Sequence, residues 1–318
     1  MKDKYNWALL GTGIIADEMA QAFKKSGREI YSVGSRNPDN ASSFAKRHNV
    51  KKAYGDFRQL FDDNNVDIIY IATPQNAHLE YICKALENGK SVLCEKSITQ
   101  DSNELYIARD AAVKSGAFLA EAMTIYHMPL YKKLISMQAD GVFGKVNMIQ
   151  LNFGSYKEYN MENRFFNKKM AGGAMLDIGV YAISLARMFM SEKPDRLLSQ
   201  VKYAPSGVDE QVGILMMNSK EQMGVISLSF HSKQPKRAVI SCDKAYIEIM
   251  EYPRSDEAAI VYTATGEKEI IKCGDSGSAL CYEIEDMEKT VSGSEDLSFL
   301  KYSTDVMEIM TDIRKQWK

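Results

Sequence analysis

The sequence predicts an α/β fold with two domains, and two patterns along the 318-residue chain lead to this prediction. Short apolar runs alternate with amphipathic segments over residues 5–121, which is typical of βαβ units around a doubly wound parallel sheet. After residue 121, strand-like runs follow one another with short polar turns, which indicates a mainly antiparallel sheet. We therefore expect a parallel-sheet domain over residues 1–121 and an α+β domain over residues 122–318.

The first domain should contain five strands, at residues 5–10, 29–35, 66–73, 90–95 and 117–122. The helices expected between them lie at residues 17–26, 40–48, 78–89 and 104–116. In such a sheet the C-terminal ends of the strands meet at one edge, where ligands bind.

The second domain should contain strands at residues 145–156, 212–220, 222–232, 237–243 and 246–252. Helices expected near residues 130–138, 178–190, 279–292 and 302–316 would cover one face of the sheet. Exposed edges of a large antiparallel sheet favour self-association, so we expect a homodimer or a higher homo-oligomer.

Composition favours a small-molecule substrate over a polymeric partner. A net charge of −2 without a Lys/Arg block gives no reason to expect nucleic acid or an anionic membrane. The N-terminal apolar run is too short for a signal peptide, and no later run reaches transmembrane length, which predicts a cytoplasmic protein. The spacings of five cysteines and four histidines predict reduced thiols and no metal site.

The motif GTGIIA lies between the first expected strand and the first expected helix, where dinucleotide-binding folds place their phosphate-binding turn. Gly11 permits a tight turn, Gly13 lets the backbone approach a pyrophosphate, and Ala16 stands in place of a third glycine. The helix N-terminus adds N–H groups and partial positive charge. The expected phosphate-binding residues are Gly11, Thr12, Gly13, Ile14 and Ile15.

The second expected strand ends in VGSR, and this ending bears on the choice between NAD and NADP. An acidic residue there would bind the ribose 2′-hydroxyl of NAD, whereas Ser35 and Arg36 suit the 2′-phosphate of NADP. We therefore favour NADP, with NAD as the alternative cofactor. A solvated loop arginine is the structural alternative for Arg36.

Two more loops, ATPQNAH and CEKS, leave the same edge of the predicted sheet. Taken singly, Asn76 can be a helix cap, His78 a residue of a helix face and Lys96 a surface lysine. Their shared position beside the expected cofactor favours a functional role. Lys96 beside a nicotinamide would polarise an alcohol or carbonyl oxygen.

The motif GGAMLDIGVY permits both a structural and a catalytic interpretation. Asp177 is a suitable N-cap for a helix that begins near Ile178, and Tyr181 can be a core aromatic residue of that helix. Residues four apart also lie on one helix face, so Asp177 and Tyr181 can both point to one site.

Taken together, these motifs resemble those of the Gfo/Idh/MocA oxidoreductases. The resemblance covers nearly the whole chain, through LLGTGIIA, the segment from YGDF to CEKS, EAM, NRFF and GGAMLDIGVY, in the order found in the family. The ending DIGVY most resembles the branch of the dimeric dihydrodiol dehydrogenases. The family has a Rossmann domain followed by an open-faced, mainly antiparallel sheet, which is used for the substrate pocket and for oligomerisation.

The resemblance also implies roles for individual residues. Lys96, Asp177 and Tyr181 fall on catalytic positions, and Arg164 lies near the substrate pocket. The implied cofactor-contacting loops contain Thr73, Pro74, Asn76, His78 and Glu95. Two departures concern Ser97, where the family usually has proline, and the segment Thr124 to His127, which should change the pocket.

These observations predict reversible hydride transfer between NADP(H) and a secondary alcohol or carbonyl group of a sugar, polyol or cyclic diol. Tyr181 would exchange the hydroxyl proton with its pKa lowered by Lys96, and Asp177 would orient the substrate. Three alternatives remain: a regulator that senses NADP(H) or a sugar, an NAD-dependent enzyme for inositol-like substrates, and an oligomerisation scaffold with a vestigial pocket.

Overall fold

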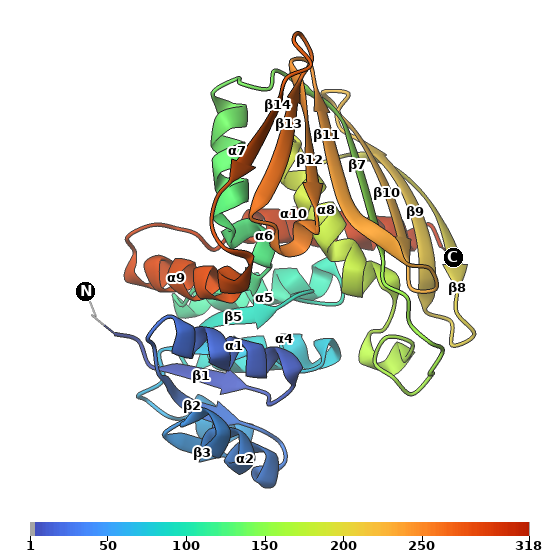
Figure 1. Cartoon of the computed structure of the whole chain (residues 1–318). Coiled ribbons are helices and arrows are strands. Elements are labelled where there is room, and N and C mark those ends of the chain that lie inside the picture. The colour runs from blue at the N-terminus through green and yellow to red at the C-terminus, as the bar shows by residue number, and fades with distance from the viewer. Residues whose placement is uncertain (1–3, 318) are drawn as a thin grey trace. The chain divides into compact units, whose positions relative to one another are not determined.

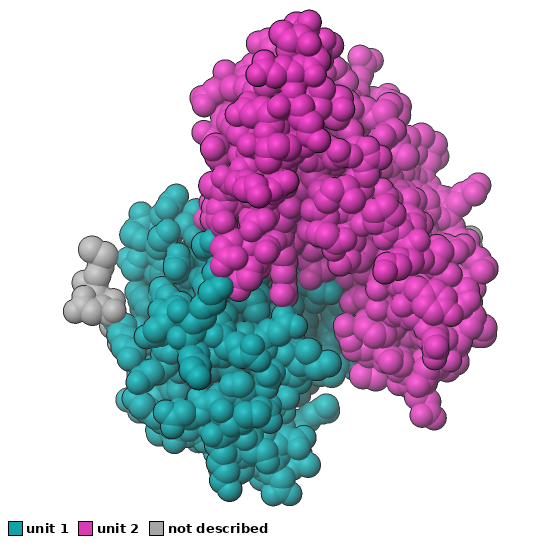
Figure 2. All heavy atoms as spheres, viewed as in Figure 1, with its two compact units in different colours: residues 1–123, 278–300 teal, residues 124–277, 301–318 magenta. Residues whose placement is uncertain are grey.

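The computed structural model describes residues 4–317 and contains one sheet in each of two compact units (Figures 1 and 2). Unit 1 extends to residue 123 and also includes residues 278–300. Unit 2 includes residues 124–277 and resumes at residue 301. The fold class is the predicted one, a Rossmann-type parallel sheet together with a mainly antiparallel sheet.

The sheet of unit 1 has six strands in the order β3-β2-β1-β4-β5-β6, and all its pairings are parallel. The strands are β1 (Trp7–Leu10), β2 (Ile30–Gly34), β3 (Lys52–Tyr54), β4 (Ile68–Ile71), β5 (Ser91–Glu95) and β6 (Leu119–Ala122). The chain reverses its direction of strand addition between β1 and β4. Ligands of doubly wound sheets bind at this point, beyond the C-terminal ends of the strands.

Within residues 4–317, six helices accompany this sheet: α1 (Ile14–Lys25), α2 (Pro38–His48), α3 (Phe57–Phe61), α4 (His78–Glu87), α5 (Ser102–Ser115) and α9 (Ala279–Ser292). A short 3-10 turn, η1 (Gln75–Ala77), precedes α4. Local sequence explains several boundaries. Asn37 and Asp101 cap the starts of α2 and α5 through their side chains, and Gly116 ends α5 in a left-handed conformation.

Helix α9 packs in unit 1 rather than against the second sheet. Leu280, Ile284 and Met287 of α9 are buried in one cluster with Trp7 and Phe23. Trp7 also donates its indole N–H to Glu288, with a 3.1 Å distance between Nε1 and Oε1. The prediction that the helix near residues 279–292 covers the second sheet is therefore wrong, because its apolar face does not specify which sheet it meets.

The sheet of unit 2 has eight strands in the order β14-β13-β12-β11-β7-β10-β9-β8. The pair β10 and β7 is parallel and the other pairings are antiparallel. The strands are β7 (Val146–Gly154), β8 (Arg196–Tyr203), β9 (Asp209–Met217), β10 (Met223–Ser229), β11 (Gln234–Cys242), β12 (Ala245–Met250), β13 (Glu257–Tyr262) and β14 (Lys268–Lys272).

The helices of this part of the chain are α6 (Thr124–His127), α7 (Pro129–Ala139), the π-helical turn η3 (Met175–Gly179), α8 (Val180–Phe189) and α10 (Leu300–Lys315). The 3-10 turns of the described residues 124–317 are η2 (Lys168–Met170), η4 (Tyr252–Arg254) and η5 (Ser276–Ser278). Helix α8 packs against β7 and β10, and all of its residues except the half-buried Tyr181 are buried. Within residues 4–317, every helix is too short or too polar to cross a bilayer.

The other face of the sheet in unit 2 exposes apolar side chains. Leu198, Leu215 and Val225 lie beside one another across β8, β9 and β10, and all three are exposed. They alternate with buried residues such as Ile214 and Ile226, whose side chains point to the opposite face. This face is available for the expected self-association, which stays a prediction.

Strands β3, β8, β13 and β14 and helix α3 were not predicted. β3 has only three residues, and β8 and β14 are the two edges of the larger sheet. Edge strands carry many polar and charged residues, as in KEIIK of β14, so they lack the apolar run that marks a central strand.

Candidate active site

The Gly11 turn connects β1 to α1 at the point where the strand order reverses. Gly11 has a φ of +115°, and its N–H donates to the Gly34 carbonyl at 2.9 Å. A Cβ atom at this position would lie 2.5 Å from the Ala72 carbonyl oxygen. Only glycine fits there, because the backbone conformation and the close approach to the end of β4 both exclude a side chain.

The rest of this turn has room for a ligand. Gly13 is the N-cap of α1, and a Cβ atom added to it would meet nothing within 4 Å. The first N–H groups of α1 follow directly at Ile14 and Ile15, whereas Ala16 is fully buried against the core. The buried Thr73 hydroxyl has no hydrogen-bond partner among the described residues. The turn therefore fits a dinucleotide.

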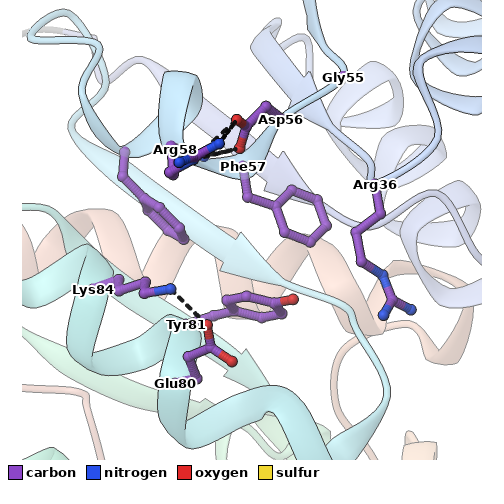
Figure 3. A pocket seen from close by; sticks show the side chains of 9 residues that line it. Arg36, Gly55, Asp56, Phe57, Arg58, Glu80, Tyr81 and Lys84 are labelled. Carbon is purple, nitrogen blue, oxygen red and sulfur yellow. Dashed lines mark hydrogen bonds and ion pairs between the residues drawn. The ribbon is translucent and has the colours of Figure 1, made fainter.

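Arg36 lines an open pocket of ≈ 520 Å³ between the start of α3 and α4 (Figure 3). Two other cations line the pocket, and both are paired: Arg58 with Asp56 at 2.8 Å and Lys84 with Glu80 at 2.5 Å. Among residues 4–317, Arg36 forms no ion pair with a carboxylate. The pocket therefore contains one guanidinium that is available to an anionic ligand.

Ser35 is nearly buried beside this pocket. Its hydroxyl oxygen accepts the Asn37 N–H at 3.3 Å, and its own N–H donates to the Tyr54 carbonyl at 3.0 Å. The hydroxyl proton remains available for an acceptor such as a phosphate oxygen.

His78 connects two of the predicted cofactor loops. One ring nitrogen lies 3.0 Å from the Thr73 carbonyl, and the other lies 3.2 Å from the Ser97 carbonyl and 3.3 Å from the Ile98 carbonyl. Burial lowers the pKa of His78, so the ring is neutral near pH 7 and donates from one nitrogen. Pro74 and Asn76, by contrast, are exposed at the η1 turn.

Lys96 begins the loop after β5, and the chain on both sides of it is held by hydrogen bonds. Before it, Glu95 Oε2 accepts the Lys96 N–H at 3.2 Å. After it, the Ser97 carbonyl accepts from the Gln75 side chain at 3.1 Å, and the Ile98 N–H donates to Glu121 at 3.0 Å. The loop is thus fixed at the same sheet edge as the Gly11 turn.

Asp177 does not cap a helix, which corrects the sequence prediction. Helical structure already begins at Met175 with the π-helical turn η3, and Asp177 is the third residue of that turn. The N–H of Met175 donates to the buried Asp209 carboxylate at 2.6 Å. Because a residue 34 positions away caps the helix, the local sequence pattern did not reveal the true start.

Three of the predicted site residues, Arg164, Asp177 and Tyr181, lie in unit 2. Arg164 Nη2 lies 3.4 Å from Asp177 Oδ1, and the guanidinium also lies over the Phe165 ring at 4.2 Å. Tyr181 packs against Phe153 with ring centroids 6.1 Å apart. The predicted substrate-binding arginine is therefore paired with one predicted catalytic residue, whereas Lys96 belongs to unit 1.

Asp209 is a residue of this region that sequence reasoning missed. A Cβ atom at Gly173 would clash with Asp209 Oδ1, so the glycine turn before η3 leaves room for this carboxylate. Burial raises the pKa of Asp209 to about 6, although the Met175 N–H and the charge of Arg314 act in the opposite direction. A lone aspartate at the start of a strand carries no sequence signal for this role.

Folding stability should depend on pH through Asp209. The folded protein binds the Asp209 proton more tightly than the unfolded chain, where the pKa is 3.8, so this group favours folding most at low pH. We expect the free energy of unfolding, relative to that of Asp209→Asn, to fall by about 2 kcal/mol from about pH 4 to about pH 7. Urea denaturation of both proteins measures this difference, and a difference independent of pH would contradict the prediction.

The parallel sheet and its glycine turn define a dinucleotide-binding protein, and comparisons with protein families agree. The family model described as "Oxidoreductase family, NAD-binding Rossmann fold" matches residues 5–123. The model of the GFO/IDH/MocA C-terminal domain matches residues 131–248. The chain belongs to the Gfo/Idh/MocA family, and it is an NAD(P)-dependent oxidoreductase.

Curated relatives are similar over most of the chain. The trans-1,2-dihydrobenzene-1,2-diol dehydrogenase of Xenopus laevis is 30% identical over 259 residues, which cover 80% of this chain and 78% of the relative. The human protein of the same name is 28% identical, over 77% of this chain and 74% of its own length.

Solved structures show the same fold at lower identity. The 3-ketoreductase KijD10 of Actinomadura kijaniata, in complex with NADP and TDP-benzene, has a TM-score of 0.87 and 19% identity over 98% of both chains. A levoglucosan dehydrogenase in complex with NADH and levoglucosan also has a TM-score of 0.87 and 19% identity, over 98% of this chain and 97% of its own.

Proposed function

We propose that the protein is an NADP-dependent dehydrogenase or reductase that acts on a secondary alcohol or carbonyl group of a sugar, polyol or cyclic diol. One observation carries this proposal: hydrogen bonds fix the Lys96 loop at the sheet edge that also bears the Gly11 turn. An ammonium group at that edge suits the polarisation of a substrate oxygen. The names of the relatives, which act on diols or sugars, support the substrate class.

Each predicted residue then has a chemical task. Lys96 donates a hydrogen bond to the substrate oxygen, and Tyr181 exchanges the hydroxyl proton at its Oη atom. Asp177, oriented by Arg164, accepts hydrogen bonds from neighbouring substrate hydroxyls. The nicotinamide, when bound, supplies or accepts the hydride.

The Gly11 turn, with Thr12 and Thr73, would hold the pyrophosphate end of the cofactor. Ser35 and Arg36 would bind the 2′-phosphate of NADP, since Arg36 has no carboxylate partner among residues 4–317. Glu95 stays a proposed cofactor-contacting residue, and its carboxylate oxygens accept hydrogen bonds from Tyr70 and from the Lys96 N–H.

Titration of the cofactor-stripped protein with NADPH and NADH tests the cofactor proposal. We expect NADPH to bind at least ~10-fold more tightly, a difference of about 1.4 kcal/mol. Arg36→Ala should remove this preference by weakening NADPH binding ~10-fold or more, because a charge-assisted hydrogen bond to the phosphate is lost. Nicotinamide fluorescence reports both dissociation constants.

Arg58→Ala is the matched control, because Arg58 lines the same pocket but is paired with Asp56. It should leave the NADPH preference within about twofold of the native value. Equal affinity of the native protein for both cofactors would instead favour an enzyme that does not select NADP.

The substrate class is tested with a panel of sugars, polyols and cyclic diols that includes levoglucosan and trans-1,2-dihydrobenzene-1,2-diol. We expect reduction of NADP⁺ by at least one member, followed by absorbance. Tight NADPH binding without turnover of any member would favour the alternative of a regulator that senses NADP(H) or a sugar. Binding of neither cofactor would favour a vestigial pocket.

A further inference from the structure

Tyr70 connects strand β4 to the Lys96 loop through a single carboxylate. The Tyr70 phenol donates a hydrogen bond to Glu95 Oε1, and Glu95 Oε2 accepts the Lys96 N–H at 3.2 Å. One oxygen of the Glu95 carboxylate therefore binds the Tyr70 side chain, and the other binds the main chain at Lys96. The orientation of this carboxylate and the direction of the peptide at Lys96 depend on each other.

The sheet register explains why the two side chains meet. Tyr70 of β4 is paired with Leu93 of β5, and Glu95 lies two residues beyond Leu93 on the same face of the sheet. Tyr70 is fully buried, and burial together with the charge of Glu95 raises the pKa of its phenol well above the usual value. The phenol therefore remains a hydrogen-bond donor throughout the working pH range.

The residue after Lys96 increases the importance of this contact. Ser97 has no ring to restrict its own φ, so the loop relies on hydrogen bonds for its direction. Those bonds come from Gln75 and His78 after Lys96, and from Glu95 before it. Of these three side chains, Glu95 is the one that binds the main chain of Lys96 itself.

We propose that Tyr70 is a positioning residue for Lys96, acting through Glu95. This inference rests on the proposed function, in which the Lys96 ammonium contacts the substrate oxygen. Tyr70 itself contacts neither substrate nor cofactor in this account. Removing its hydroxyl takes away the hydrogen bond that holds Glu95 Oε1, and with it one constraint on the carboxylate that accepts the Lys96 N–H.

Tyr70→Phe tests the proposal, because it removes only the hydroxyl and keeps the buried ring. The matched control is Tyr54→Phe, which removes a phenol that donates to the Asp63 carboxylate at 2.7 Å on the edge strand β3 of the same sheet. Two measurements are made on each full-length variant: amide hydrogen exchange of the segment around Lys96, and steady-state kinetics with NADPH titration.

We expect Tyr70→Phe to speed amide exchange at Lys96 at least ~10-fold and to lower kcat by ~10-fold or more, with the NADPH dissociation constant within about twofold of native. Tyr54→Phe should change neither the amide exchange at Lys96 nor kcat. Native exchange at Lys96 and native kcat in Tyr70→Phe would overturn the proposal.

The exchange measurement separates this inference from the proposed function. If the native protein turns over no substrate but Tyr70→Phe alone exposes the Lys96 amide, then Tyr70 positions Lys96 and the proposed function fails. If the native protein is active and Tyr70→Phe keeps full kcat despite faster exchange, the positioning of Lys96 by Tyr70 has no part in turnover and the inference fails.

Discussion

Tyr181→Phe should lower kcat by about 100-fold or more while the NADPH dissociation constant stays within about twofold of native. The substitution removes the Oη atom that exchanges the substrate proton in the proposed mechanism. It keeps the aromatic ring, which packs against Phe153 at a centroid distance of 6.1 Å, so the helix should remain in place. Steady-state kinetics with the best substrate of the panel and a fluorescence titration measure the two quantities.

Tyr126→Phe provides the control for this experiment. Although Tyr126 belongs to the segment Thr124–His127, its side chain is fully buried and therefore does not line an open pocket. It donates its phenol hydrogen to Ser184 of α8 at 3.0 Å, so the same atom is removed next to the same helix. We expect this variant to retain native kcat even if its stability falls by about 1 kcal/mol. Native turnover in Tyr181→Phe would remove Tyr181 from the mechanism.

Gly11→Ala should abolish cofactor binding and destabilise the protein. The native φ of +115° costs a non-glycine residue about 1–3 kcal/mol, and the new Cβ atom would lie 2.5 Å from the Ala72 carbonyl oxygen. Either the turn or the end of β4 must therefore move, and both lie at the expected cofactor site. Urea denaturation and NADPH titration follow stability and binding in the same preparation.

Substitutions at two other glycines distinguish the effect of backbone strain on stability from the effect of a lost ligand contact on NADPH binding. Gly27 has a φ of +69° with open space around it, so Gly27→Ala should cost about 1 kcal/mol and leave NADPH binding unchanged. Gly13 has an extended conformation and open space, so Gly13→Ala should fold normally but weaken NADPH binding ~10-fold by blocking the phosphates. Unchanged binding in Gly13→Ala would mean that the phosphates do not approach this turn.

The sequence predicts the central strands of the parallel sheet because these strands are buried. Ile68–Ile71 and Ser91–Glu95 appear as apolar runs for the same reason that they lie inside a parallel sheet. The edge strands β8 and β14 contact solvent and carry polar residues, so their sequences resemble loops. Prediction therefore improves with burial and is poorest at sheet edges.

The predicted site shows the same limit of local patterns. The Gly11 turn was predicted because its glycines serve a local backbone conformation. The helix begins before Asp177, where the local sequence does not predict it, because the residue that caps it is Asp209 of the distant strand β9. Tyr70 looked like one more residue of an apolar run, although its hydroxyl reaches the residue before Lys96. Contacts between distant parts of the chain leave no periodic signal.

The placement of α9 has a consequence for the order in which the chain can fold during synthesis. The cluster that surrounds Trp7 and Phe23 also includes Leu280, Ile284 and Met287, which are translated more than 250 residues later. All of the strands of the larger sheet leave the ribosome before these three residues. The parallel sheet must therefore wait until Met287 has been translated to complete its core, and a nascent chain ending at residue 121 would expose that apolar surface.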